Sequence, residues 1–143
     1  MFRDIKPSDK EPFLAMGQEF FSSTAVAHTI DPQHFVRTFD EAIGHNPYLR
    51  ILIIEIDNRI VGYAQLSFTY SNEAGGMVVL IEEVYIDESQ RGKGIGKKLF
   101  EFIEKEYPSA GRFRLEVARN NQRAIDLYQH LGYKVLDYLQ MVK

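Results

Sequence analysis

The segment Arg91-Gly92-Lys93-Gly94-Ile95-Gly96 constrains the fold more than any other part of the chain. It follows the apolar, β-branched run from Met77 to Ile86 and precedes a stretch in which apolar residues recur at helical spacing. A strand must therefore pass through a glycine-rich turn directly into a helix. Glycine allows close approach of the backbone to a ligand, and the free N–H groups of a helix N-terminus attract anions. The segment, with Lys97 and Lys98 beside it, predicts a phosphate or pyrophosphate site.

Two better-known phosphate-binding turns do not fit this segment. A P-loop needs Ser or Thr after its lysine, whereas Lys97 is followed by Lys98. A dinucleotide-binding turn has the spacing GxGxxG and opens its fold, whereas Gly92, Gly94 and Gly96 give GxGxG after several strands. A tight turn that binds no ligand remains the structural alternative.

Changes in apolar periodicity divide the chain into helices and strands. We expect, in order, a strand at Phe2–Lys6, helices that begin near Pro7 and Pro32, strands at Tyr48–Ile56, Ile60–Tyr70 and Met77–Ile86, a helix from Ile95, a strand at Arg112–Ala118, a helix from Asn121 to Gly132, and a β-prone end at Tyr133–Val142. This order predicts a single domain over residues 1–143, of the α/β (α+β) class. We expect a mixed, mostly antiparallel central sheet of about six or seven strands with about four flanking helices.

Composition excludes several classes of function. The formal net charge of −3 gives no bulk field to attract nucleic acid or an anionic membrane, and it suits a cationic substrate better. The chain has no cysteine, which excludes disulfides, thiolate metal sites and an acyl-cysteine intermediate. Its four histidines form no metal-binding pair, so we predict no metal. The charged N-terminus and the lack of a run of ~20 apolar residues predict a soluble, cytoplasmic protein.

The glycine-rich segment resembles the R-x-x-G-x-G pyrophosphate loop of the GCN5-related N-acetyltransferases, the GNAT superfamily. The preceding residues 82–87 are similar to the end of that family's fourth strand. The stretch from Asn121 to Tyr128, with the closing Leu131-Gly132-Tyr133, is similar to its second cofactor motif. The order of elements fits along nearly the whole chain. The acidic pair in residues 82–87 adds a fainter similarity to the diamine acetyltransferases.

The resemblance implies a site for acetyl-CoA, used as a co-substrate without a metal. The family's fourth and fifth strands splay apart, and the pantetheine arm pairs with the fourth strand, here at Val84, Tyr85 and Ile86. Asn121 would contact the same arm while capping the last helix. The residues implied for the pyrophosphate are Arg91, Gly92, Lys93, Gly94, Ile95 and Gly96.

Acetyl transfer to an amine needs a deprotonated amine, a stabilised oxyanion and a proton for the leaving thiolate. The resemblance implies that Tyr128 is the general acid and that the N–H of Val84 stabilises the oxyanion. It favours Glu82 as the general base, directly or through a water. Because neighbouring strand residues alternate, we expect Glu82 and Glu83 on opposite faces, with only one of them near the amine. The alternatives are that Tyr128 is a core residue and that both glutamates are surface residues.

The sequence therefore predicts an N-acetyltransferase that moves an acetyl group from acetyl-CoA to a primary amine by direct attack in a ternary complex. We expect the acceptor to be a small-molecule or protein amine. Because members of this family often form homodimers, the resemblance also implies a possible homodimer. We expect the first two helices and the loop Asn72–Gly76 to build the acceptor site. A non-catalytic acyl-CoA-binding or sensing domain and a nucleotide-phosphate binder remain alternatives. The acidic residues that could recognise a cation there are Asp31, Asp40, Glu41 and Glu73.

Overall fold

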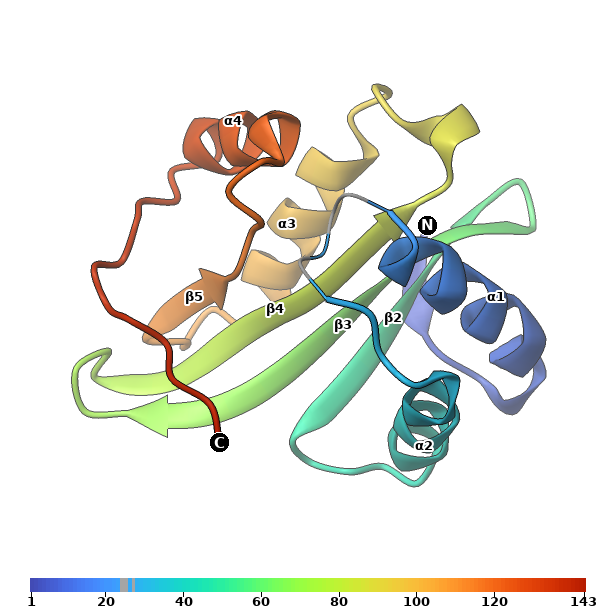
Figure 1. The fold of residues 1–143 in the computed structure, drawn as a ribbon, viewed down its shortest axis with the longest axis horizontal. Coiled ribbons are helices and arrows are strands. Elements are labelled where there is room, and N and C mark those ends of the chain that lie inside the picture. The colour runs from blue at the N-terminus through green and yellow to red at the C-terminus, as the bar shows by residue number, and fades with distance from the viewer. Residues whose placement is uncertain (24–25, 27) are drawn as a thin grey trace.

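A computed structural model describes residues 1–23, 26 and 28–143. Its centre is a five-stranded sheet in the order β1-β2-β3-β4-β5, in which only β4 and β5 run parallel (Figure 1). The strands are β1 (Phe2–Asp4), β2 (Leu49–Ile56), β3 (Arg59–Ser71), β4 (Gly76–Ile86) and β5 (Arg112–Leu115), and the helices are α1 (Lys10–Phe21), α2 (Pro32–Ile43), α3 (Ile95–Glu106) and α4 (Gln122–His130). The predicted mostly antiparallel sheet and the four flanking helices are confirmed for the described residues.

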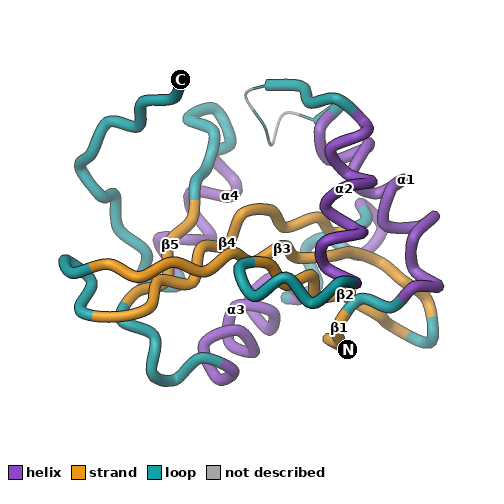
Figure 2. Tube along the Cα trace, turned by 90° about the horizontal axis from the view of Figure 1, so that it is seen from below, coloured by secondary structure: helices purple, strands orange, loops and turns teal. Residues whose placement is uncertain are grey.

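Helices cover both faces of the sheet. Figure 2 shows the sheet nearly edge-on, with α1 and α2 on one side and α3 on the other. On the α1/α2 side, Phe13 packs edge-on against Tyr63 with 5.1 Å between ring centroids. We call this side's buried cluster the aromatic core: Phe13, Met16, Phe20, Phe35, Phe39, Ile51, Ile53, Tyr63 and Tyr85. The aliphatic core on the α3 side is centred on Leu52, Leu66, Val79, Leu99 and Ile103.

Local signals set several element ends where the sequence predicts them. Asp31 caps α2 by accepting from the N–H of Gln33, with Pro32 at the first helical position. Asp57 and Asn58 both have positive φ, at 49° and 60°, which suits the tight turn of the β2–β3 hairpin. No helix in the described part of the chain is long and apolar enough to cross a bilayer.

The prediction of a sixth or seventh strand is wrong. The segment from Tyr133 to Val142 forms no ladder in the described residues, and the sheet ends at β5. Figure 1 shows this C-terminal segment passing β5 and β4 without joining the sheet. Tyr133 still packs against Phe100 at the aliphatic core, but the apolar side chains from Val135 onward are exposed, with Leu139 91% exposed and Val142 97%. β-branched residues favour strands through packing against a neighbouring strand, and this segment has no such neighbour here.

Gly62 sets how closely the end of β4 approaches β3. It is the cross-strand partner of Ile86. A Cβ added at Gly62 would collide with the carbonyl oxygen of Tyr85 and would lie 3.0 Å from Cδ1 of Ile54. Because the first of these contacts is with backbone, a side chain at Gly62 can be accommodated only by moving β4.

We expect Gly62→Ala to lower the free energy of unfolding by about 1–3 kcal/mol, because the added methyl group displaces backbone. The control is Gly76→Ala, also in β4's ladder, where a Cβ would meet nothing closer than 3.7 Å. This control should be neutral or stabilising by up to about 1 kcal/mol. Urea unfolding of both variants makes the comparison, and equal losses would contradict the close approach at Gly62.

Candidate active site

β5 pairs with the first half of β4 only. Their register runs from Val78 opposite Arg112 to Ile81 opposite Leu115. Beyond Ile81, β4 keeps β3 as its partner, while the chain leaves β5 after Leu115. The strand predicted at Arg112–Ala118 therefore ends earlier, at Leu115. Within the described residues, no strand pairs with the β5-facing edge of β4 from Glu82 to Ile86, so this edge can pair with an extended ligand.

The glycine-rich turn between β4 and α3 exposes a row of backbone donors. Gly92 and Gly94 adopt left-handed conformations, with φ of 80° and 76°, which explains why both positions need glycine. The N–H groups of residues 92–97 donate to no acceptor in the described chain. A Cβ on Gly94 would have no atom within 4 Å, so the space in front of the α3 N-terminus is open. These features fit a phosphate group.

Basic side chains surround this turn, and one of them comes from a distant part of the chain. Nε of Arg91 donates to the carbonyl of Ile86 at 2.8 Å, which ties the turn to the end of β4. Nη2 of Arg123 lies 3.8 Å from the Cβ position of Gly92. Sequence reasoning missed Arg123, although it lies inside the Asn121–Tyr128 motif. The turn therefore combines free amides with cations from two separate segments.

Helix α4 meets the turn, and two predicted site residues lie at its N-cap and within it. A Cβ on Gly96 would lie 3.4 Å from Cδ2 of Leu127, so this glycine allows the helices to approach closely. Asn121 caps α4 by accepting from the N–H of Ala124 at 3.3 Å. Tyr128 packs against Phe100 with 5.5 Å between ring centroids, and it also lines a groove of about 1090 Å³ beside β5. Burial raises the pKa of the Tyr128 phenol, which keeps it protonated at neutral pH.

A β-bulge corrects the expectation that Glu82 and Glu83 lie on opposite faces. The β3–β4 register passes from Gln65 opposite Glu83 to Leu66 opposite Ile81, so Glu82 is an extra residue. Ser67 Oγ donates to Glu82 at 2.6 Å, and Tyr63 OH donates to Glu83 at 2.8 Å. Since residues 63 and 67 lie on the same face of β3, both carboxylates lie on the α1/α2 side.

The two glutamates differ in environment. Glu82 is exposed, whereas Glu83 is half-buried beside Tyr63. Burial raises the pKa of Glu83 to about 7, and the negative charge of Glu82 acts in the same direction. The hydrogen bond from Tyr63 opposes this shift. Glu83 can therefore gain or lose a proton near neutral pH.

A third carboxylate reaches the same face from α1. Tyr85 OH donates to Glu19, and burial is the main cause that raises the pKa of Tyr85 to about 12. The rings of Tyr63 and Tyr85 stack with 6.1 Å between centroids. Two tyrosines from neighbouring strands thus each donate a hydrogen bond to a glutamate. Sequence reasoning missed Glu19, because only the packing of α1 on the sheet brings it near Tyr85.

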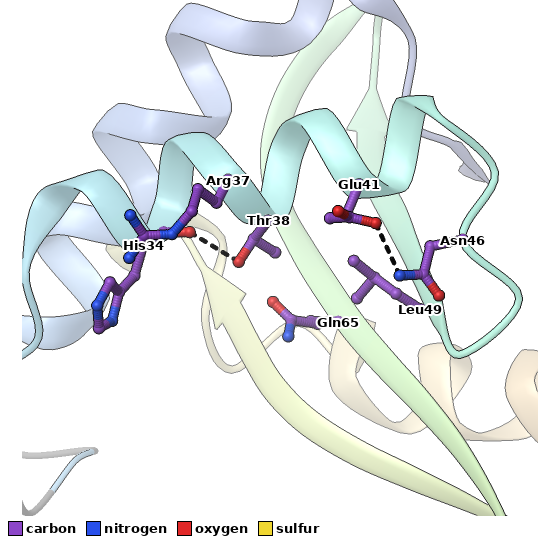
Figure 3. Close-up of a pocket in the computed structure, with 7 residues that line it drawn as sticks. All are labelled: His34, Arg37, Thr38, Glu41, Asn46, Leu49 and Gln65. Atoms are coloured by element: carbon purple, nitrogen blue, oxygen red, sulfur yellow. Dashed lines mark hydrogen bonds between the residues drawn. The ribbon is translucent and has the colours of Figure 1, made fainter.

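The acidic residues predicted for the acceptor site do not gather in one place. Asp31 caps α2, Asp40 lies 3.8 Å from Lys10, and Glu73 lies 3.9 Å from Arg112. Glu41 alone among the four lines a pocket between α2 and β3 (Figure 3). The negative charge on the α1/α2 side of the site comes instead from Glu19, Glu82 and Glu83.

A sequence model of the acetyltransferase (GNAT) family matches residues 14–133, a span that includes the turn and α4. Thialysine N-epsilon-acetyltransferase from Sus scrofa is 33% identical over 146 aligned residues, covering 95% of this chain and 85% of that protein.

Two solved structures share the fold. A possible acetyltransferase from Clostridium difficile 630 superposes with a TM-score of 0.85 at 18% identity, covering 100% of this chain and 95% of that one. An aminoglycoside N-acetyltransferase in complex with CoA gives a TM-score of 0.81 at 16% identity, covering 100% of this chain and 93% of that one. At this level of identity, the two similarities extend to the architecture alone.

The raised pKa of Glu83 predicts a pH-dependent gain in stability for Glu83→Gln. A carboxyl with a pKa near 7 when folded and 4.5 when unfolded destabilises the fold progressively as pH rises from about 4.5 to 7. Glutamine cannot ionise, so at pH 8 the variant should exceed the parent protein's free energy of unfolding by about 1–3 kcal/mol. At pH 4.5 the difference should vanish. Urea unfolding at both values tests this, with Glu88→Gln, at an exposed position away from Glu83, as the control; a gain at both values would rule out ionisation as its cause.

Proposed function

This chain belongs to the acetyltransferase (GNAT) family, and we propose that it transfers the acetyl group of acetyl-CoA to a primary amine by direct attack in a ternary complex. The observation that carries the proposal is the position of Glu83. This half-buried carboxyl, with a pKa of about 7, lies one residue before Val84, on the part of β4 whose outer edge is unpaired. A proton acceptor thus lies beside a strand edge suited to an extended cofactor arm.

The residues around the glycine-rich turn fit the cofactor. The amides of residues 92–97 would hold the pyrophosphate, with charge from Arg91, Lys93 and Arg123. The open edge at Val84, Tyr85 and Ile86 would pair with the pantetheine arm, and Asn121 would contact it from the start of α4. When bound, acetyl-CoA supplies the activated thioester.

We assign the general base to Glu83 rather than to Glu82, which the sequence favoured. An alkylammonium has a pKa near 10.4 and must lose its proton before its nitrogen can attack. A Glu83 Oε atom would accept this proton, and the hydrogen bond from Tyr63 fixes the orientation of the carboxylate. Glu82, held by Ser67 on the same face, would attract the incoming cation through its charge.

Two other residues would complete the transfer. The backbone N–H of Val84 would stabilise negative charge on the carbonyl oxygen. Tyr128 would donate its phenolic proton to the departing thiolate, since burial keeps the phenol protonated at neutral pH. Its position on the groove beside β5 would let solvent return the proton.

The acceptor we propose is a small molecule with a terminal primary amine. Glu19, Glu82 and Glu83 give the α1/α2 face a negative charge that suits an ammonium group. The Sus scrofa relative is named for acetylation at the ε-nitrogen of thialysine, an amine at the end of a flexible side chain. The charge favours a cationic acceptor, and the name of the relative favours a flexible alkylamine.

The assignment of the base predicts distinct effects for the two glutamates. Glu83→Gln should lower kcat/KM by about 10²–10⁴-fold, because it removes the proton acceptor. In the parent protein, kcat/KM should rise with pH through about 7, as Glu83 ionises. Glu82→Gln should keep this rise but move it to lower pH, because the charge of Glu82 no longer raises the pKa of Glu83, and should mainly raise KM. Thiol release from acetyl-CoA measures the activity of both variants. A larger loss of kcat in Glu82→Gln than in Glu83→Gln would indicate that Glu82 is the general base.

A second pair of variants separates catalysis from cofactor binding. Tyr128→Phe should reduce acetyl transfer by about 10²-fold while leaving the Kd for CoA nearly unchanged, because only the acidic proton is lost. Arg123→Ala should do the reverse and weaken CoA binding about tenfold. Calorimetric titration with CoA and thiol release give the two readouts. If CoA binds and no primary amine in a broad panel releases thiol, the chain is an acyl-CoA sensor instead.

A further inference from the structure

The groove beside β5 is much larger than the proposed acetyl transfer requires. Its volume of about 1090 Å³ matches the upper end of the roughly 300–1,000 Å³ that ligand pockets have. An acetyl group adds a single methyl group to the thioester carbonyl and would fill only a small part of this space. The walls of the groove come from β5, α4 and the C-terminal segment after Gly132, which passes β5 without joining the sheet (Figure 1).

The inner wall of the groove is apolar and belongs to the packed part of the fold. Because side chains alternate along β5, its charged residues Arg112 and Arg114 lie on the opposite face of the strand from its apolar ones. Several apolar side chains both line the groove and pack against the aliphatic core. They are Phe113, Leu115, Tyr128, Leu131 and Tyr133. An alkyl chain in the groove would therefore lie against a continuous apolar surface.

The outer wall carries apolar side chains that are in contact with solvent. Val135 is 90% exposed and Leu139 91%, and both line the groove. Leu136 also lines it and is 41% exposed. Exposed apolar side chains that gather at one groove are typical of a site for an apolar ligand. A chain held between the two walls would remove water from both of them.

The groove reaches the place where the thioester would lie. Leu115 pairs with Ile81 at the point where β5 ends, and both Leu115 and Val117 line the groove. Tyr128, the proposed proton donor to the thiolate, would lie within hydrogen-bond distance of the sulfur, roughly 3 Å. The acyl carbon is bonded to that sulfur. The part of an acyl chain beyond the carbonyl therefore starts at the groove that Tyr128 lines.

We propose that this groove binds the alkyl chain of the donor, and that the protein transfers linear acyl groups longer than acetyl from their CoA thioesters. The inference rests on the proposed acetyltransferase function and widens its donor class. The bond between the acyl carbon and sulfur breaks, and a bond from this carbon to the amine nitrogen forms. The ammonium loses one proton to Glu83 before the attack. The second proton that the nitrogen loses balances the one that Tyr128 gives to the thiolate.

The test compares hexanoyl-CoA with acetyl-CoA, which has four fewer methylene groups, with the same primary amine as acceptor. Burial of one methylene group improves binding about fourfold. The KM of the parent protein for hexanoyl-CoA should be at least about tenfold below that for acetyl-CoA, because about two buried methylene groups suffice for this ratio. Thiol release measures both values. Equal KM values, or no transfer of the hexanoyl group, would overturn the inference.

Two exposed positions on the C-terminal segment provide matched variants. Leu139→Glu places a charge on the outer wall and should reduce the ratio of the two KM values to less than about threefold, with the values for acetyl-CoA nearly unchanged. Met141→Glu is the control, because Met141 is 92% exposed and does not line the groove. This control should keep the full ratio. A full ratio in Leu139→Glu would show that the groove does not hold the chain.

A binding measurement separates this inference from the proposed function. If no donor releases thiol, the acetyltransferase proposal fails, and calorimetric titration with hexanoyl-CoA and acetyl-CoA then tests the groove alone. Tighter binding of hexanoyl-CoA by the parent protein and Met141→Glu, lost in Leu139→Glu, supports the inference, and equal binding of both thioesters by the parent overturns it. Analytical ultracentrifugation tests a different occupant. A parent dimer that Leu139→Glu converts to monomers, with an unchanged KM ratio, would assign the groove to a second copy of the chain and overturn the inference.

Discussion

One extra residue in β4, at Glu82, determines how the site is arranged. With regular alternation, Glu83 would point to the aliphatic core, where an unpaired carboxyl is costly. The bulge turns it to the side of Tyr63, whose hydroxyl gives it a partner. After the bulge the alternation resumes, so Tyr85 lies in the aromatic core and Val84 packs against the aliphatic core. A single unpaired residue thus places two carboxylates on one face without disturbing the packing on either side.

β4 can leave one edge unpaired beyond Ile81 because its other edge pairs with β3 along its whole length. β3 pairs with β4 from Ser71–Gly76 to Gly62–Ile86, whereas β5 pairs with it only as far as Ile81. Gly62 allows close approach at the far end of this ladder. The end of β4 is therefore fixed in position while its outer backbone groups stay available. The glycine-rich turn continues this arrangement, since it presents free amides at the start of a helix that is anchored in the aliphatic core.

The sequence predicted features that depend on neighbours in the chain and missed those that depend on distant contacts. The left-handed glycines, the Asn121 cap and the β2–β3 hairpin follow from local spacing. The bulge left no local signal, because Glu82 and Glu83 look the same under regular alternation. Arg123 reaches the turn, and Glu19 reaches Tyr85, only through the packing of helices on the sheet. The expected strand after Tyr133 has β-prone residues, but propensity alone does not supply the neighbouring strand that a ladder needs.

Among the polar groups on the α1/α2 face, the choice of the proton acceptor depends on which group changes charge near neutral pH. Burial raises the pKa values of Tyr63 and Tyr85, so both hydroxyls stay protonated and act as fixed hydrogen-bond donors. Glu83 differs, since burial and the charge of Glu82 raise its pKa to about 7 against the opposing hydrogen bond from Tyr63. An arriving ammonium would lower this pKa by its positive charge, which favours the carboxylate. The approach of a cationic substrate would therefore itself favour the ionised form of Glu83 that can accept its proton.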